Sequence, residues 1–179
     1  MVSQRMFTAD EARRVGDRIG INWSEVDLEQ FRMGLEVELE HGVRNCPDTI
    51  FEAGSVSKQF TAAAVLLLAG DGRLSLDDPV RKYVPELPES AAAITIRQML
   101  HHTSGLRDWG SVAWIGGWPR GTRVYTHDHV LEIVSKQKSL NFDPGTKWSY
   151  SNTGFNLAAI IVSRVSGMSF AEFSKQRIF

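Results

Sequence analysis

Apolar residues at helical spacing dominate the chain and predict a mostly α-helical protein. Residues 1–45 are polar and acidic, and they predict a helical hairpin. Its second helix carries an apolar stripe whose members are three or four positions apart, formed by Leu28, Phe31, Leu35 and Leu39. Gly42 follows this stripe and is a typical helix end. The amino-terminal part is therefore predicted to be a small helical module.

Two later segments predict buried helices. The longest apolar run of the chain, residues 62–70, overlaps the second half of a helix expected from about Val56 to Leu68. A second strongly apolar helix is expected from Asn152 or Thr153 to Val165, with Gly167 ending it. Alternating strand patterns are almost absent. The expected fold class is mixed α and β but helix-dominated, with domains at residues 1–45 and 46–179.

Local signals predict the shorter elements. Thr95 is a typical N-cap for a short helix over residues 96–100, and Asp128 for a helix over residues 129–137. Residues 107–124 hold three tryptophans, four glycines and a proline, which favours a packed irregular loop. A last short helix is expected from about Ser169.

Composition and charge exclude several classes of function. The formal net charge of −1 over 179 residues gives no reason to expect nucleic acid as a partner. No apolar run reaches the roughly 18–20 residues of a membrane span, and no signal-like stretch follows Met1, so a cytoplasmic location is expected. His127 and His129 flank Asp128, but no further ligand cluster accompanies them, which favours a solvated helix start. Neither a metal site nor a cofactor is expected.

Two clusters carry candidate chemistry. Lys58 follows Ser55 by three residues, so a helix would bring an amine to the serine hydroxyl on one face. Packing of Lys58 beside apolar residues would favour the neutral amine, which can accept a proton. Tyr150 and Asn152 lie farther along the chain and supply a phenol and an amide. A Ser-x-x-Lys spacing arises by chance about once in a chain of this length, and a tyrosine before a helix is usually a packed aromatic.

Four sequence segments that occur in a particular order make a chance origin of the two clusters less credible. They are IFEAGSVSKQFT from residue 50, LSLDDPV from residue 74, MLHHTSGL from residue 99 and PGTKWSYSN from residue 144. This series resembles the serine beta-lactamase-related hydrolases, which include class C beta-lactamases, D-alanyl-D-alanine carboxypeptidases and esterases. The resemblance covers about residues 47–179. It implies Ser55 as the acylated nucleophile, Lys58 as its proton partner, Tyr150 as the base and Asn152 as a ligand of substrate or Lys58.

Two departures from that family affect the expected activity. The family's third motif, a Lys/His-Thr/Ser-Gly strand, does not occur, so the fold is expected to be incomplete and the turnover weak or absent. Second, the family's amino-terminal helix and first strands should precede Phe51, but residues 1–45 do not look like them. Residues 6–45 resemble instead a small helical domain family of unknown function, through FRMGLEVELEHG from residue 31.

Two functions therefore stay open. The first is a serine hydrolase acting on a small amide or ester through an acyl-enzyme. The alternative is a non-catalytic helical interaction protein with a hydrolase remnant. Self-association is expected through the surface that the missing sheet would cover.

Overall fold

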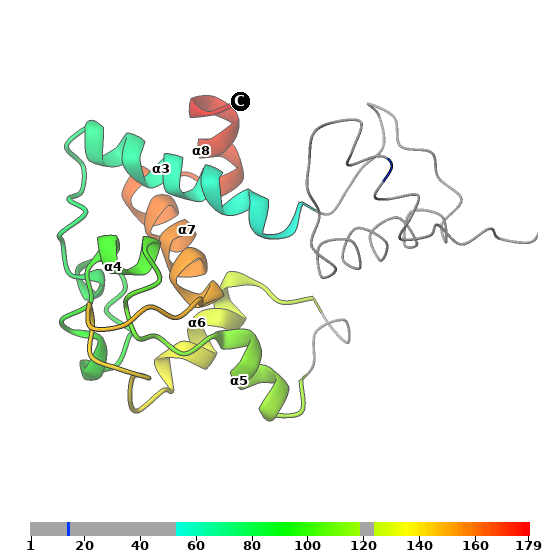
Figure 1. Cartoon of the computed structure of the whole chain (residues 1–179). Helices are drawn as coiled ribbons and strands as arrows, with labels where there is room; N and C mark the ends of the chain where they lie inside the picture. The colour runs from blue at the N-terminus through cyan, green and yellow to red at the C-terminus, as the bar shows by residue number, and fades with distance from the viewer. Residues whose placement is uncertain (1–13, 15–52, 119–123) are drawn as a thin grey trace, which may run out of the picture. The chain divides into compact units, whose positions relative to one another are not determined.

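The computed structural model describes residue 14 and residues 53–118 and 124–179 (Figure 1). The two longer stretches belong to one compact unit, Ala53–Phe179. The predicted helical hairpin of residues 1–45 lies outside the described residues, apart from Arg14. The elements, in chain order, are η1 (Gly54–Ser57), α3 (Lys58–Gly70), η2 (Val80–Lys82), η3 (Glu89–Ala91), α4 (Ile96–Leu100), α5 (Trp109–Ile115), α6 (His127–Ser135), α7 (Asn152–Ser166) and α8 (Phe170–Arg177).

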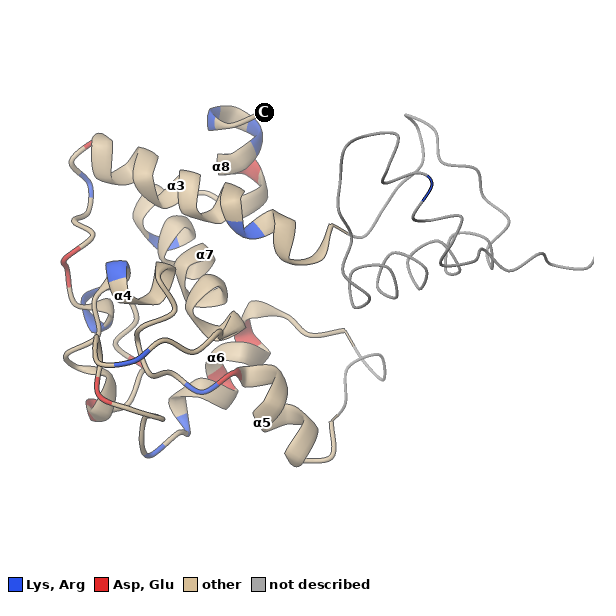
Figure 2. Cartoon of the chain, viewed as in Figure 1, with Lys and Arg blue, Asp and Glu red and all other residues tan. Residues whose placement is uncertain are grey.

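Helix α7 is the centre of this unit, since it contacts α3, α4, α5, α6 and α8 (Figure 1). Eight of its 15 residues are buried, which explains why its sequence is apolar on nearly every face. Helix α3 is similar: Lys58 is its single charged residue, and Figure 2 shows the rest of the helix uncharged. The two long apolar helices predicted from the sequence are thus confirmed.

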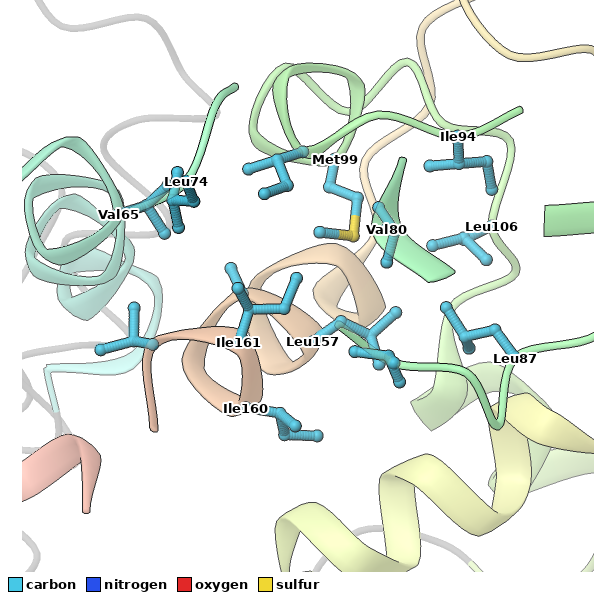
Figure 3. Close-up of a cluster of buried hydrophobic side chains, with 14 of the residues drawn as sticks. Val65, Leu74, Val80, Leu87, Ile94, Met99, Leu106, Leu157, Ile160 and Ile161 are labelled. Carbon is cyan, nitrogen blue, oxygen red and sulfur yellow. The ribbon is translucent and has the colours of Figure 1, made fainter. Parts of the chain in front are cut away.

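The hydrophobic core joins α7 to α3, α4 and the chain between them. Figure 3 shows Leu157 and Ile161 of α7 in the same cluster as Val65 of α3 and Met99 of α4. Each of these four side chains is at most 1% exposed. Burial of such side chains contributes roughly 1.5–3 kcal/mol each, so this cluster is the main source of stability for the unit.

Side-chain caps define where several helices begin. Thr95, Thr126 and Ser169 each form a capping box at the starts of α4, α6 and α8. The prediction of Thr95 as a cap is confirmed, and so is the short helix expected from about Ser169. The prediction of Asp128 as a cap is wrong, because extended Thr126 accepts the His129 amide and places Asp128 inside the first turn. Gly167 ends α7 in the left-handed conformation with φ of 75°, as predicted.

Residues 107–124 were predicted to be irregular, and the structure corrects this. Helix α5 (Trp109–Ile115) occupies the middle of the segment. Its N-cap is Asp108, whose carboxylate accepts a hydrogen bond from the Ser111 amide. The cap was not predicted because the glycines and tryptophans of the segment favoured a loop. Trp109 is partly buried with its ring 4.9 Å from that of Tyr125, whereas Trp114 is 67% exposed. Packing in this segment is therefore uneven.

Strand structure is minimal in the part of the chain that is described. It consists of one isolated antiparallel bridge between Pro79 and Thr95, so the helix-dominated class is confirmed for these residues. In the same residues no single helix is long and apolar enough to cross a bilayer, although α7 and α8, bent by 76°, meet the length and composition criteria as a pair.

Candidate active site

Ser55 and Lys58 meet at the start of the first helical segment. The 3-10 turn η1 leads directly into α3, which begins at Lys58. The Lys58 Nζ donates a hydrogen bond of 3.0 Å to the Ser55 Oγ. Ser55 is exposed and lies in the first turn, where backbone N–H groups point away from the helix and favour a developing negative charge. The spacing of three residues thus brings amine and hydroxyl together.

Tyr150 reaches this helix start from an extended segment 95 residues away in sequence. That segment runs along the loop before α5, because the Gly145 amide donates to the Thr103 carbonyl and the Ser149 amide to the His102 carbonyl. The Tyr150 Oη lies 2.6 Å from the Ser55 Oγ, and either oxygen can donate. The two clusters found in the sequence therefore meet in space.

The surroundings of Tyr150 favour its ionised form. Interaction with Lys58 is the first cause and the hydrogen bond with Ser55 the second, and together they lower the pKa of the phenol from 10.0. Burial and the charge of Asp108 act in the opposite direction but do not cancel this effect. A larger fraction of Tyr150 is thus ionised at neutral pH than of an isolated tyrosine, and the ionised oxygen can accept a proton.

Asn152 completes the contacts of Lys58. Its Oδ1 accepts a hydrogen bond of 2.9 Å from the Lys58 Nζ. The same ammonium lies 5.1 Å from the centroid of the Tyr150 ring and 5.8 Å from that of Phe155. Aromatic faces and an amide oxygen therefore surround Lys58, and the structure brings together all four residues singled out from the sequence. Their catalytic roles stay predictions.

His102 packs against the ring of Tyr150 and binds the backbone of the next residue. It has φ of 58°, and its Nδ1 accepts a hydrogen bond of 3.2 Å from the Ser151 amide. Its ring lies 4.6 Å from the Tyr150 ring, at an interplanar angle of 32°. Burial, followed by the positive charge of Lys58, lowers the pKa of His102, so the ring stays neutral and keeps its acceptor nitrogen.

Asp108 is the charged residue of the site that sequence reasoning missed. Its Oδ2 accepts hydrogen bonds from the Asn152 backbone amide at 2.7 Å and from the Asn152 Nδ2 at 2.9 Å. A helix start at Asp108 was the available signal, but the neighbouring glycines and tryptophans pointed to a loop. Phe155, one turn into α7 beside Lys58, was also missed.

An open pocket of about 640 Å³ lies next to Lys58 and Asn152. Its other lining residues include the apolar side chains of Phe60, Phe155 and Phe170. Ser55 and Tyr150 do not line it, so the pocket lies beside the nucleophile rather than over it. Among the described residues, no group of three or more His, Cys, Asp or Glu side chains is arranged to hold a metal ion.

Comparison of the sequence with models of known protein families shows which family the chain belongs to. The model of the family described as "Beta-lactamase" matches residues 30–179. The chain belongs to the beta-lactamase family. The match begins before residue 47, where the resemblance was expected to start, and so includes part of the predicted module of residues 1–45. The boundary between the two predicted domains stays a prediction.

Beta-lactamase family relatives match the chain along about three quarters of its length. Penicillin-binding protein 4* of Bacillus subtilis (strain 168) is 38% identical over 133 residues, which are 74% of this chain and 29% of that protein. D-aminopeptidase of Brucella canis is 32% identical over 134 residues, covering 74% of this chain and 25% of that protein. The solved structure of the octameric penicillin-binding protein homologue from Pyrococcus abyssi is 33% identical, with a TM-score of 0.67. That match covers 78% of this chain and 33% of the other.

The chain thus spans about a quarter to a third of the length of these relatives. The likeness in fold extends over a third of the matched structure, and the catalytic activity of the whole relatives is not carried over by the match alone.

Proposed function

We propose that this chain carries the nucleophile and proton-transfer groups of a serine hydrolase that forms an acyl-enzyme on small amides or esters. One observation carries the proposal: the Ser55 Oγ is within hydrogen-bond distance of both the Tyr150 phenol and the Lys58 amine. A serine needs a neighbouring base to become a nucleophile, and these two groups supply it without a histidine.

In the proposed acylation, the Ser55 Oγ attacks the substrate carbonyl carbon while Tyr150 takes the hydroxyl proton. The carbonyl oxygen becomes an oxyanion, to which the Ser55 amide N–H would donate a hydrogen bond. When the tetrahedral intermediate collapses, the bond to the leaving amine or alcohol breaks and Tyr150 returns the proton to that group. Water then attacks the ester carbonyl, with Tyr150 in the same role, and frees the acid and Ser55.

Lys58 favours transfer of the serine proton to Tyr150 by stabilising the ionised phenol beforehand. Its Nζ donates to the Ser55 Oγ and to the Asn152 Oδ1. The positive charge favours tyrosinate over tyrosine, which is the direction of the Tyr150 pKa shift.

Covalent labelling tests the proposal directly. The chain is incubated with a fluorophosphonate or a penicillin, and intact-protein mass spectrometry counts the adducts. One adduct is expected on the wild type and none on Ser55→Ala. Ser57→Ala is the matched control, because Ser57 lies in the same turn, donates to the Gly54 carbonyl and has no lysine three residues later. No adduct on the wild type at millimolar probe refutes the function for this chain.

The relatives suggest the substrate class. A D-aminopeptidase and a D-amino acid amidase are both among the proteins similar to this chain, and the names of both point to D-amino acid chemistry. We therefore favour amides of D-amino acids over those of L-amino acids. Release of the amine from matched D- and L-alanine anilides compares the two, and an equal or greater rate with the L-substrate contradicts this choice.

A further inference from the structure

We propose that Asp108 is a positioning residue of this site, one that fixes the side-chain amide of Asn152 so that its oxygen faces Lys58. The inference rests on the proposed function, because orientation of Asn152 matters through Lys58 and Ser55. Asp108 itself touches neither the Ser55 hydroxyl nor the Tyr150 phenol in any hydrogen bond of the structure.

The first step is the donor and acceptor pattern of the amide. The Asn152 Nδ2 donates to the Asp108 Oδ2 at 2.9 Å, while the Asn152 Oδ1 accepts from the Lys58 Nζ at 2.9 Å. A carboxylate only accepts and an ammonium only donates. The amide rotated by 180° would direct its oxygen at the carboxylate and its NH₂ at the ammonium. Asp108 and Lys58 together therefore permit one orientation.

The second step is the rigidity of Asp108. Its Oδ1 accepts the Ser111 amide at the start of α5, and its Oδ2 also accepts the Asn152 backbone amide at the start of α7. On either side of it, the Thr153 Oγ1 donates to the Arg107 carbonyl and accepts from the Trp109 amide. The carboxylate is thus held between two helix starts, so it can hold Asn152 in turn.

The third step is electrostatic. The groups facing the Tyr150 phenol and ring are Ser55, Lys58 and His102, and the charge of Asp108 acts from farther away. Asp108 raises the pKa of Tyr150, against the larger lowering by Lys58. Removal of its charge should lower this pKa further, so the acid limb of the acylation rate should move to lower pH.

The test measures the rate of Ser55 acylation by a fluorophosphonate as a function of pH. Asp108→Asn keeps the shape but can present NH₂ to Asn152, so we expect about a tenfold slower reaction, roughly the value of one charge-assisted hydrogen bond. Its acid limb should lie at lower pH than that of the wild type. Asp108→Ser should show the same loss while keeping a cap for α5, so it decides the question if Asp108→Asn does not fold.

Two controls separate positioning from helix capping. Thr126→Ala removes the cap of α6 and should leave the acylation rate and its pH profile unchanged. In an Asn152→Ala background, Asp108→Asn should slow acylation little further, because no side-chain amide remains at residue 152 for Asp108 to orient. Equal losses in Thr126→Ala and Asp108→Asn, or an undiminished effect of Asp108→Asn in the Asn152→Ala background, overturn the inference.

A readout independent of acylation distinguishes this inference from the proposed function. In the wild type, one side-chain amide proton of Asn152 should be protected from solvent exchange in ¹⁵N–¹H NMR spectra, and Asp108→Asn should remove that protection. Absence of protection in the wild type overturns the inference. Protection without any acylation retains the positioning contact and refutes the proposed function instead.

Discussion

Tyr150 is the residue whose ionisation controls the proposed reaction. Its pKa is lowered from 10.0, chiefly by Lys58, so tyrosinate forms at lower pH than in an isolated tyrosine. The acylation rate should therefore rise with pH along a limb centred below 10. Tyr150→Phe should lose this limb and slow acylation by about 10²–10⁴, the usual contribution of a positioned general base. Stopped-flow or quenched labelling across pH measures both.

Tyr125→Phe is the matched control for that experiment. It also removes one phenol, which in the wild type donates to the Trp118 carbonyl away from Ser55. Its rate and pH limb should equal those of the wild type. A limb that survives in Tyr150→Phe would assign the base to another group, with Lys58 the nearest alternative.

At the scale of elements, local signals were readable from the sequence and distant contacts were not. Thr95 was predicted as an N-cap, and a helix was predicted from about Ser169, because such signals lie within a few residues of the helix start. The approach of Ser55 and Lys58 followed in the same way from helical spacing. The contact of Asp108 with Asn152 joins residues 44 positions apart, and no spacing rule predicts it. The approach of Tyr150 was expected only through the family resemblance.

The loop between α4 and α5 needs glycine at residue 105. Gly105 has φ of +74°, and a Cβ there would lie 2.2 Å from the Phe142 carbonyl oxygen. Gly105→Ala should therefore destabilise the protein by roughly 2–4 kcal/mol, from the left-handed backbone and the clash together. Urea unfolding followed by circular dichroism measures this difference.

Gly72→Ala separates the cost of the left-handed backbone from the cost of the steric clash. Gly72 has φ of +70°, but a Cβ there would meet nothing within 4 Å. This variant should lose only about 1 kcal/mol, the conformational part of the cost. Equal losses for the two variants would mean that the segment around Phe142 moves aside without cost, and the tight loop would not be a requirement of the fold.

For the whole molecule, acid should weaken the fold in two steps. Burial lowers the pKa of His102 and His127 below 6.5, so the unfolded chain binds these protons first as pH falls. Among the described residues, every carboxyl group with a resolved shift has a lowered pKa: Asp71, Asp77, Asp78, Glu86 and Glu172. Their stabilisation is present above about pH 4.5 and is lost as pH falls through their folded-state values.

Asp78 is the carboxyl group best suited to test the second step, the loss of carboxylate stabilisation in acid. The Tyr83 hydroxyl, the Ser75 amide and Lys82 lower its pKa to about 2. These contacts hold the turn that places Val80 in the core. Asp78→Asn should lower the melting temperature at pH 7, and its difference from the wild type should shrink between pH 4 and pH 2. Tyr83→Phe removes the largest cause, so it should shrink that pH dependence. A constant difference from pH 7 to pH 2.5 would show that Asp78 acts by shape rather than by charge.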